Sequence, residues 1–116
     1  MSGIQHKSLA AGRWRELTLF EQFGNVGSEI SRAAKWRSRN PALAEGALHR
    51  ALELLDLTLD DPRIRQSGPR LREIARSRKV VVDFFAGTNV YGSTADSIQR
   101  YFDAYAIAAR RRLPSS

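Results

Sequence analysis

Residues 18–41 read TLFEQFGNVGSEISRAAKWRSRNP, and this stretch contains the start of one helix and the start of the next. Thr18 followed three residues later by Glu21 is a capping box, in which a hydroxyl and a carboxylate satisfy free backbone N–H groups at a helix start. Asn40 followed by Pro41 is a second cap, with proline at the first helical position. The stretch therefore predicts a helix that ends near Arg37 and a short turn into another helix.

Three more breaks divide the rest of the chain. They are the Asp-Asp-Pro sequence at 60–62, which ends the second helix, the Gly-Pro pair at 68–69, which starts a third, and the Gly-Thr-Asn sequence at 87–89, which ends it. Ser93 with Asp96 is predicted to cap a fourth helix that continues to about Arg112.

Four amphipathic helices with short connections have antiparallel neighbours. The sequence therefore predicts an all-α fold, an up-down-up-down antiparallel four-helix bundle over residues 16–113. Residues 1–15 are expected to form a flexible or short-helical N-terminal arm, and residues 114–116 a tail.

The composition bounds the classes of protein that the chain can belong to. Its 116 residues, 42% of them hydrophobic, fit one compact domain. Without cysteine the chain has no disulfide and no thiolate metal site. Its apolar runs are too short to cross a bilayer, and the N-terminus lacks the apolar core of a signal peptide. We expect a cytoplasmic protein with no membrane partner.

The segments NVGSEISRAAKWRSRN, RALELLDLTLDDP, RLREIARSRKVVVDFF and YFDAYAIAAR resemble a recurring set of small, uncharacterised prokaryotic four-helix proteins. The resemblance implies an all-helical single domain and carries over no function or site residue. In size and basicity, though not in motif, the chain is also similar to small four-helix proteins associated with ribosomal RNA insertions or diversity-generating retroelements.

The first helix carries a second apolar strip away from the predicted core positions Phe20 and Phe23. Its members, with a charge at the rim, are Leu19, Val26, Glu29, Ala33 and Trp36. A tryptophan on a solvated helix face is typical of an interface anchor. Trp36 could instead fold over the turn to the second helix or lie under the N-terminal arm. The strip makes a non-enzymatic interaction protein our first expectation, either a homo-oligomer (dimer or larger) or one that docks a protein partner.

The alternative expectation is a nucleic-acid-binding bundle. The net charge is +7, and residues 62–80 alone sum to +6. The candidate nucleic-acid contacts in and before the third helix are Arg63, Arg65, Arg70, Arg72, Arg76 and Lys79. Cations at this helical spacing can follow phosphates, but no aromatic residue alternates with them and no known nucleic-acid motif is present. The competing interpretation is a solvated face that pairs with the acidic second helix.

Arg78 stands out because it falls among the apolar positions of the third helix. A buried guanidinium without a partner would be very costly, so the side chain must reach water or a carboxylate. Glu29, Glu53, Asp56 and Asp83 are the candidate partners. Arg78 is therefore predicted to form a structural, buried ion pair or to carry its head to water along its stem; the functional alternative is an anion site in a cavity of the bundle.

No catalytic residue, metal ligand or cofactor is predicted. Glu45, His49 and Glu53 are spaced by one helical turn each, but the Glu-x-x-His repeat of di-iron bundles is missing. We expect a solvated acidic face at these positions. The glycine-bounded loop at 87–92 lacks the lysine of a phosphate-binding loop.

Overall fold

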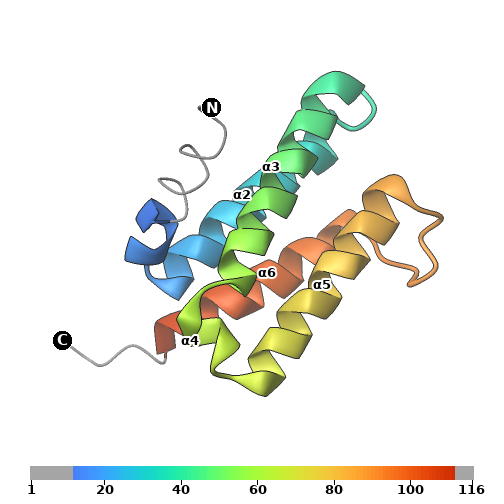
Figure 1. Cartoon of the computed structure of the whole chain (residues 1–116). Helices are drawn as coiled ribbons and strands as arrows, with labels where there is room; N and C mark the ends of the chain where they lie inside the picture. Colours follow the sequence, from blue (N-terminus) through green and yellow to red (C-terminus); the bar gives the residue numbers. More distant parts are fainter. Residues whose placement is uncertain (1–11, 112–116) are drawn as a thin grey trace, which may run out of the picture.

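The computed structural model of the protein describes residues 12–111, and all regular structure within them is helical. A helical turn over residues 12–16 is followed by α2 (Leu19–Trp36), α3 (Pro41–Leu59), α4 (Pro62–Arg65), α5 (Gly68–Ala86) and α6 (Ala95–Arg111) (Figure 1). The predicted all-α class is confirmed. The helical turn at 12–16 falls at the end of the predicted arm, for which a short helix was one of two expectations, and the short α4 is additional to the four predicted helices.

The two caps in the opening stretch form as predicted. The Glu21 N–H donates to Thr18 Oγ1 at 3.0 Å, and the Thr18 N–H donates to Glu21 Oε1 at 2.9 Å. Asn40 Oδ1 accepts from the Leu43 N–H at 3.3 Å, with Pro41 at the first position of α3. These side chains take up N–H groups that have no partner inside the helix.

The Asp-Asp-Pro sequence both ends α3 and begins α4. Asp61 is the N-cap of α4, and its Oδ1 accepts from the Arg63 N–H at 2.9 Å. The predicted break is therefore one turn of helix that redirects the chain from α3 into α5 (Figure 1).

The predicted start of the last helix is wrong by one residue. Thr94 Oγ1 accepts from the Ser97 N–H at 3.0 Å, and Ser97 Oγ accepts from the Thr94 N–H at 2.9 Å. Ser93 belongs to the preceding loop, where its N–H donates to Asn89 Oδ1. Ser97, and not Asp96, completes the reciprocal pair.

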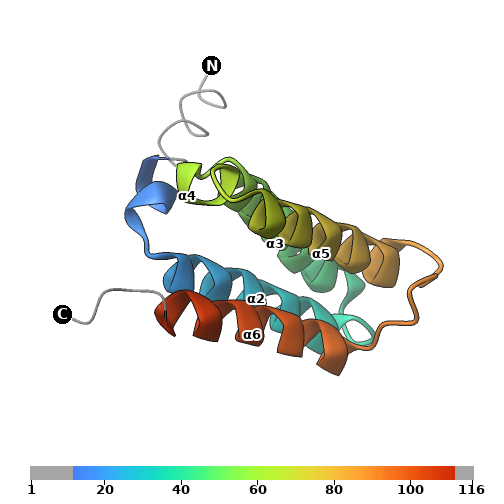
Figure 2. The same ribbon diagram turned by 90° about the horizontal axis from the view of Figure 1, so that it is seen from below.

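The long helices lie in two layers, with α2 and α6 side by side in one and α3 and α5 in the other (Figure 2). α2 packs extensively against both α3 and α6, whereas α5 makes fewer close approaches to its neighbours. Four residues of α5 are buried, against seven of α2. Much of the surface of α5 is therefore left facing outward.

The buried face of α2 differs from the predicted one. Leu19, Phe23, Val26, Ile30 and Ala33 are all buried in the core. They follow the alternating four- and three-residue spacing of a single helix stripe. The sequence analysis divided this stripe into an inner face and a second apolar strip, because it assigned Phe20 and its neighbours to the core centre. Contact with α3 on one side and α6 on the other makes the stripe one continuous buried surface.

Part of the predicted N-terminal arm belongs to the core. Trp14 is 6% exposed and packs with the buried residues of the helices. The boundary predicted at residue 15 therefore separates Trp14 from the core to which it belongs. Residues 1–11 and the predicted tail lie outside the described residues.

Candidate nucleic-acid interface

The predicted interface strip on α2 is not a surface. Leu19, Val26 and Ala33 are 8%, 0% and 0% exposed. Glu29, expected at its rim, bonds Arg32 Nη1 at 2.9 Å and Arg50 Nε at 3.1 Å, so its carboxylate links α2 to α3. The predicted strip is therefore part of the core and of the α2–α3 contact, and its buried residues cannot form an exposed interface.

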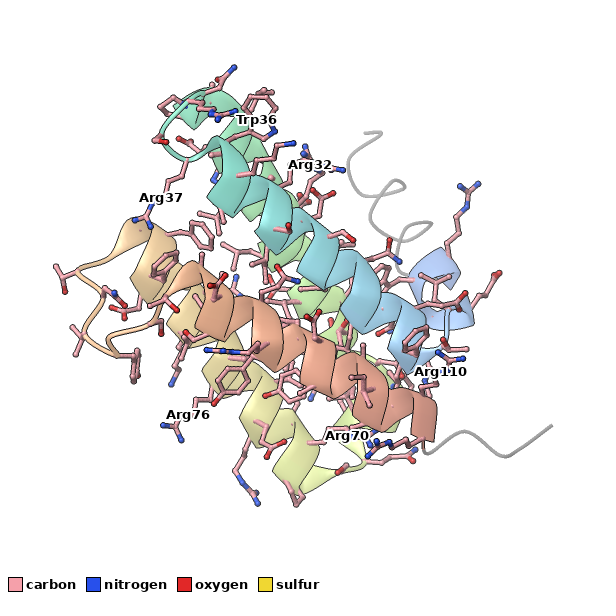
Figure 3. All side chains as sticks on the ribbon, turned by 180° about the vertical axis from the view of Figure 1, so that it is seen from behind. Arg32, Trp36, Arg37, Arg70, Arg76 and Arg110 are labelled. Carbon is pink, nitrogen blue, oxygen red and sulfur yellow. The ribbon has the colours of Figure 1, made fainter. Side chains whose placement is uncertain are left out.

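Trp36 is the last residue of α2, and it is partly buried. Its side chain lies at the end of the molecule where α2 turns into α3 (Figure 3). Its carbonyl accepts from the N–H groups of Arg39 and Asn40 in that turn. Trp36 is therefore part of the α2–α3 corner.

Arg78 forms an ion pair with one of its four candidate partners. Its Nε donates to Asp56 Oδ1 at 2.8 Å, and its Nη2 donates to Asp56 Oδ2 at 3.2 Å. The two side chains are 34% and 57% exposed. The predicted ion pair with a carboxylate is formed, but it is not buried, because the long side chain carries its head toward the surface, where it joins α5 to α3.

Arg63 has a structural role, since it bonds the Asp61 carboxylate and two backbone carbonyls before α2. Its Nη2 lies 2.7 Å from Asp61 Oδ2 and its Nε 2.9 Å from Asp61 Oδ1. The same Nη2 also donates to the carbonyls of Leu17 at 2.9 Å and Arg15 at 3.3 Å. Arg65 pairs with Asp60 at 3.1 Å, and both side chains are exposed. Of the six predicted nucleic-acid contacts, these two already have carboxylate partners.

A buried polar network that the sequence analysis missed surrounds Asp61. Gln22 Nε2 donates to Asp61 Oδ2 at 3.0 Å and to the Trp14 carbonyl at 2.8 Å. Thr58 Oγ1 donates to Gln22 Oε1 at 3.0 Å and accepts from Trp14 Nε1 at 2.9 Å. No buried side-chain polar atom among the described residues lacks a partner. The network therefore ties residue 14, α2, α3 and α4 together.

The charge at Asp61 is stabilised by these bonds. Burial alone raises the pKa of the Asp61 carboxyl, but hydrogen bonds from Arg63 and Gln22 outweigh burial and lower it. The hydrogen bond that Arg63 donates to Asp61 raises the pKa of the Arg63 guanidinium. The sequence signal was an aspartate directly before a proline, the position from which a carboxylate caps a helix.

The outer side of α5 has a different character. Arg72, Arg76 and Lys79 are exposed, and none of them forms an ion pair with residues 12–111. Arg76 extends from α5 into solvent, and Arg70, partly buried, lies nearer the end of the molecule that holds Arg110 (Figure 3). At 1.5 Å per residue, the three exposed cations are separated along the helix by about 6 and about 4.5 Å.

Tyr105 of α6 lies against α5, and Tyr101 lies next to Tyr105. The Tyr105 hydroxyl donates to the Glu73 carbonyl of α5 at 3.2 Å, and the ring centroid of Tyr101 lies 5.8 Å from that of Tyr105. Burial and the charge of Glu73 raise the pKa of Tyr105 to about 12, while the nearby charge of Arg76 opposes this shift. Tyr101 is 47% exposed. We call Arg72, Arg76, Lys79 and Tyr101 the α5–α6 face.

No aromatic residue alternates with these cations in the sequence, because the tyrosines come from another helix. Tyr101 follows Arg76 by 25 positions along the chain. The fold brings them together, since Tyr105, one turn from Tyr101, bonds the backbone of Glu73, which precedes Arg76 by one turn. A helix face read alone cannot show such a juxtaposition.

The acidic positions on α3 do not converge. Glu45, His49 and Glu53 are all exposed. Within residues 12–111 no group of three or more His, Asp or Glu side chains is arranged to hold a metal ion. None of the helices in that range is both long and apolar enough to cross a membrane.

Comparison of the chain with known proteins finds no matching family model, no matching curated protein and no matching solved structure.

Proposed function

We propose that this protein binds nucleic acid through the α5–α6 face. The observation that carries the proposal is the set of three exposed cations, Arg72, Arg76 and Lys79, which have no carboxylate partner within residues 12–111. Cations that are not engaged within the protein are available to replace the counterions of a phosphate backbone. The proposed role is binding, without a chemical step.

The distribution of the other cations supports this location. Arg63, Arg65 and Arg78 pair with Asp61, Asp60 and Asp56. Arg37 Nη2 donates to the Phe84 carbonyl at 3.0 Å, and its guanidinium lies over the Phe84 ring. These cations have partners within residues 12–111, whereas other exposed cations, Arg13, Lys35 and Arg39 among them, form no ion pair there. What distinguishes Arg72, Arg76 and Lys79 is their helical spacing along one outward side of α5, next to the contact of that helix with α6.

Binding of fluorescently labelled RNA and DNA strands, followed by anisotropy at low salt, tests the proposal. The variant Arg72→Gln/Arg76→Gln/Lys79→Gln is expected to bind at least about tenfold more weakly than the natural chain. The matched control is Arg13→Gln/Lys35→Gln/Arg39→Gln, which removes the same charge at exposed positions outside the face. If both variants lose affinity equally, the loss reflects net charge and not the α5–α6 face. If no strand binds at low salt, the proposal is wrong.

A second candidate function is self-association, now through α6 and not through α2. Ile107 is 51% exposed on α6, and Ala104 and Ala108 beside it are exposed as well. Small residues around a large apolar one allow a second helix to approach closely. Sedimentation velocity tests this candidate, which expects a dimer or larger that Ile107→Glu shifts toward the monomer. A monomer at every concentration would exclude it.

A further inference from the structure

We propose that the nucleic acid held by the α5–α6 face is single-stranded, with Tyr101 as the platform on which an unpaired base stacks. This inference rests on the proposed function and adds the class of ligand. Tyr101 is not part of the core, because α6 packs into the core through the buried residues Ile98, Phe102 and Ala109.

Tyr101 is exposed but held in place. Its ring lies 5.8 Å from the Tyr105 ring, at an interplanar angle of 51°. Tyr105 is itself fixed by the Phe23 ring at 5.4 Å, the Phe102 ring at 5.8 Å and the hydrogen bond to Glu73. A ring supported in this way loses little conformational freedom when a ligand stacks on it.

The neighbouring charges define the kind of molecule that fits. Arg76 is close enough to Tyr105 for its charge to act on the pKa of that hydroxyl, and Arg72 and Lys79 continue the cations along α5. A strand that places its phosphates on these cations brings a base to the Tyr101 ring. Cations that follow a backbone, together with an aromatic platform, are the combination by which proteins hold single strands.

A duplex uses only part of this face. Its phosphates can meet Arg72, Arg76 and Lys79, but its bases are paired and stacked on one another. The Tyr101 ring then has no base face to contact. Stacking on an aromatic side chain changes affinity by roughly 5- to 150-fold for each base. Because about half of Tyr101 is exposed, we expect the lower part of that range, about 5- to 20-fold.

The test compares three labelled ligands of about 20 nucleotides per strand. This length exceeds the site sizes of about 4–16 nucleotides that are typical of single-strand-binding folds. They are an oligothymidine, a duplex, and an abasic strand that has the phosphates but no bases. The natural chain is expected to bind oligothymidine about 5- to 20-fold more tightly than the abasic strand. Tyr101→Ala is expected to abolish that difference without changing affinity for the abasic strand, and Tyr101→Phe to keep it.

The outcomes separate this inference from the proposed function. If all three ligands bind with similar affinity and Tyr101→Ala changes none of them, the single-strand inference is overturned while binding itself stands. If none binds at low salt, the proposed function fails. A loss by Tyr101→Ala that is equal for all three ligands also overturns the inference, because it assigns Tyr101 a structural role. Circular dichroism melting of each variant shows whether it keeps the fold.

Discussion

The guanidinium of Arg63 contacts both oxygens of the Asp61 carboxylate, at 2.7 Å and 2.9 Å, and that carboxylate is 1% exposed. Two positions further on, Arg65 pairs with Asp60, and these side chains are 62% and 60% exposed. The two arginines lie on the same short helix and belong to one basic run of sequence. Arg63 stabilises the fold, whereas Arg65 forms an exposed ion pair of the kind that adds little to stability.

Arg63→Met is therefore expected to lower the free energy of unfolding by about 2–3 kcal/mol, because it leaves a buried carboxylate without its cation. The loss is below the 3–5 kcal/mol typical of fully buried pairs because Arg63 is itself 42% exposed. Urea unfolding measures the change. Arg65→Met is the matched control and is expected to change the free energy by about 0.5 kcal/mol or less. Similar losses in both variants would contradict the structural role of Arg63.

The stability of the protein is expected to fall in acid partly through Asp61. The folded-state pKa of this carboxyl lies below its ordinary value of 3.8, so its contribution is present above that value. The contribution is lost as the pH falls through the lower folded-state pKa. Urea midpoints measured from about pH 6 to about pH 2 report the loss. Asp61→Asn should be less stable at neutral pH, and its urea midpoint should fall less steeply in acid. If the midpoint of the variant falls as steeply as that of the natural chain, other carboxyls cause the acid sensitivity.

Glu73 is the acidic residue that accompanies the α5–α6 face, one turn before Arg76. Its side chain is exposed, and its charge reaches Tyr105. Glu73→Gln is expected to strengthen binding to single strands by about 1.5- to 5-fold at low salt, since it removes a repulsion from phosphates. Glu45→Gln, which removes an exposed charge on α3, is the control. Weaker binding by Glu73→Gln would place the strand elsewhere.

Two glycines of α2 are expected to respond oppositely to enlargement. A Cβ at Gly24 meets nothing within 4 Å, so Gly24→Ala should stabilise the protein by about 0.5–1 kcal/mol through the helix propensity of alanine. A Cβ at Gly27 lies 3.2 Å from Gln99 Nε2 and 3.6 Å from Phe102 Cβ. Gly27→Val should therefore push α6 away and lower the melting temperature. If Gly27→Val instead raised the melting temperature, α2 and α6 would be farther apart at this position than the structure shows.

Much of the helical structure could be predicted from sequence because the chain marks its own helix ends. The capping box at Thr18 and the Asn40-Pro41 pair are local signals, and both form. The error at Thr94 is also local, since two hydroxyl residues stand side by side and the loop takes the first of them.

The candidate site was harder to predict because it depends on which helices meet. Val26 is on a strip that looks exposed when α2 is considered alone, yet it is 0% exposed between α3 and α6. The pairing of Arg78 with Asp56, and not with three other acids, is fixed by the register of α5 on α3. The position of Tyr101 relative to the cations of α5 depends on the packing of α6 on α5, where Tyr105 bonds the Glu73 backbone.

The most direct test of the central claim is the salt dependence of binding to a single strand. Three phosphate contacts contribute about 2 to the slope of the logarithm of affinity against the logarithm of salt concentration. The variant Arg72→Gln/Arg76→Gln/Lys79→Gln should therefore have a slope that is shallower by about 2, while Arg13→Gln/Lys35→Gln/Arg39→Gln keeps the natural slope. If the slope is unchanged in the first variant, or falls equally in both, α5 does not bind the strand.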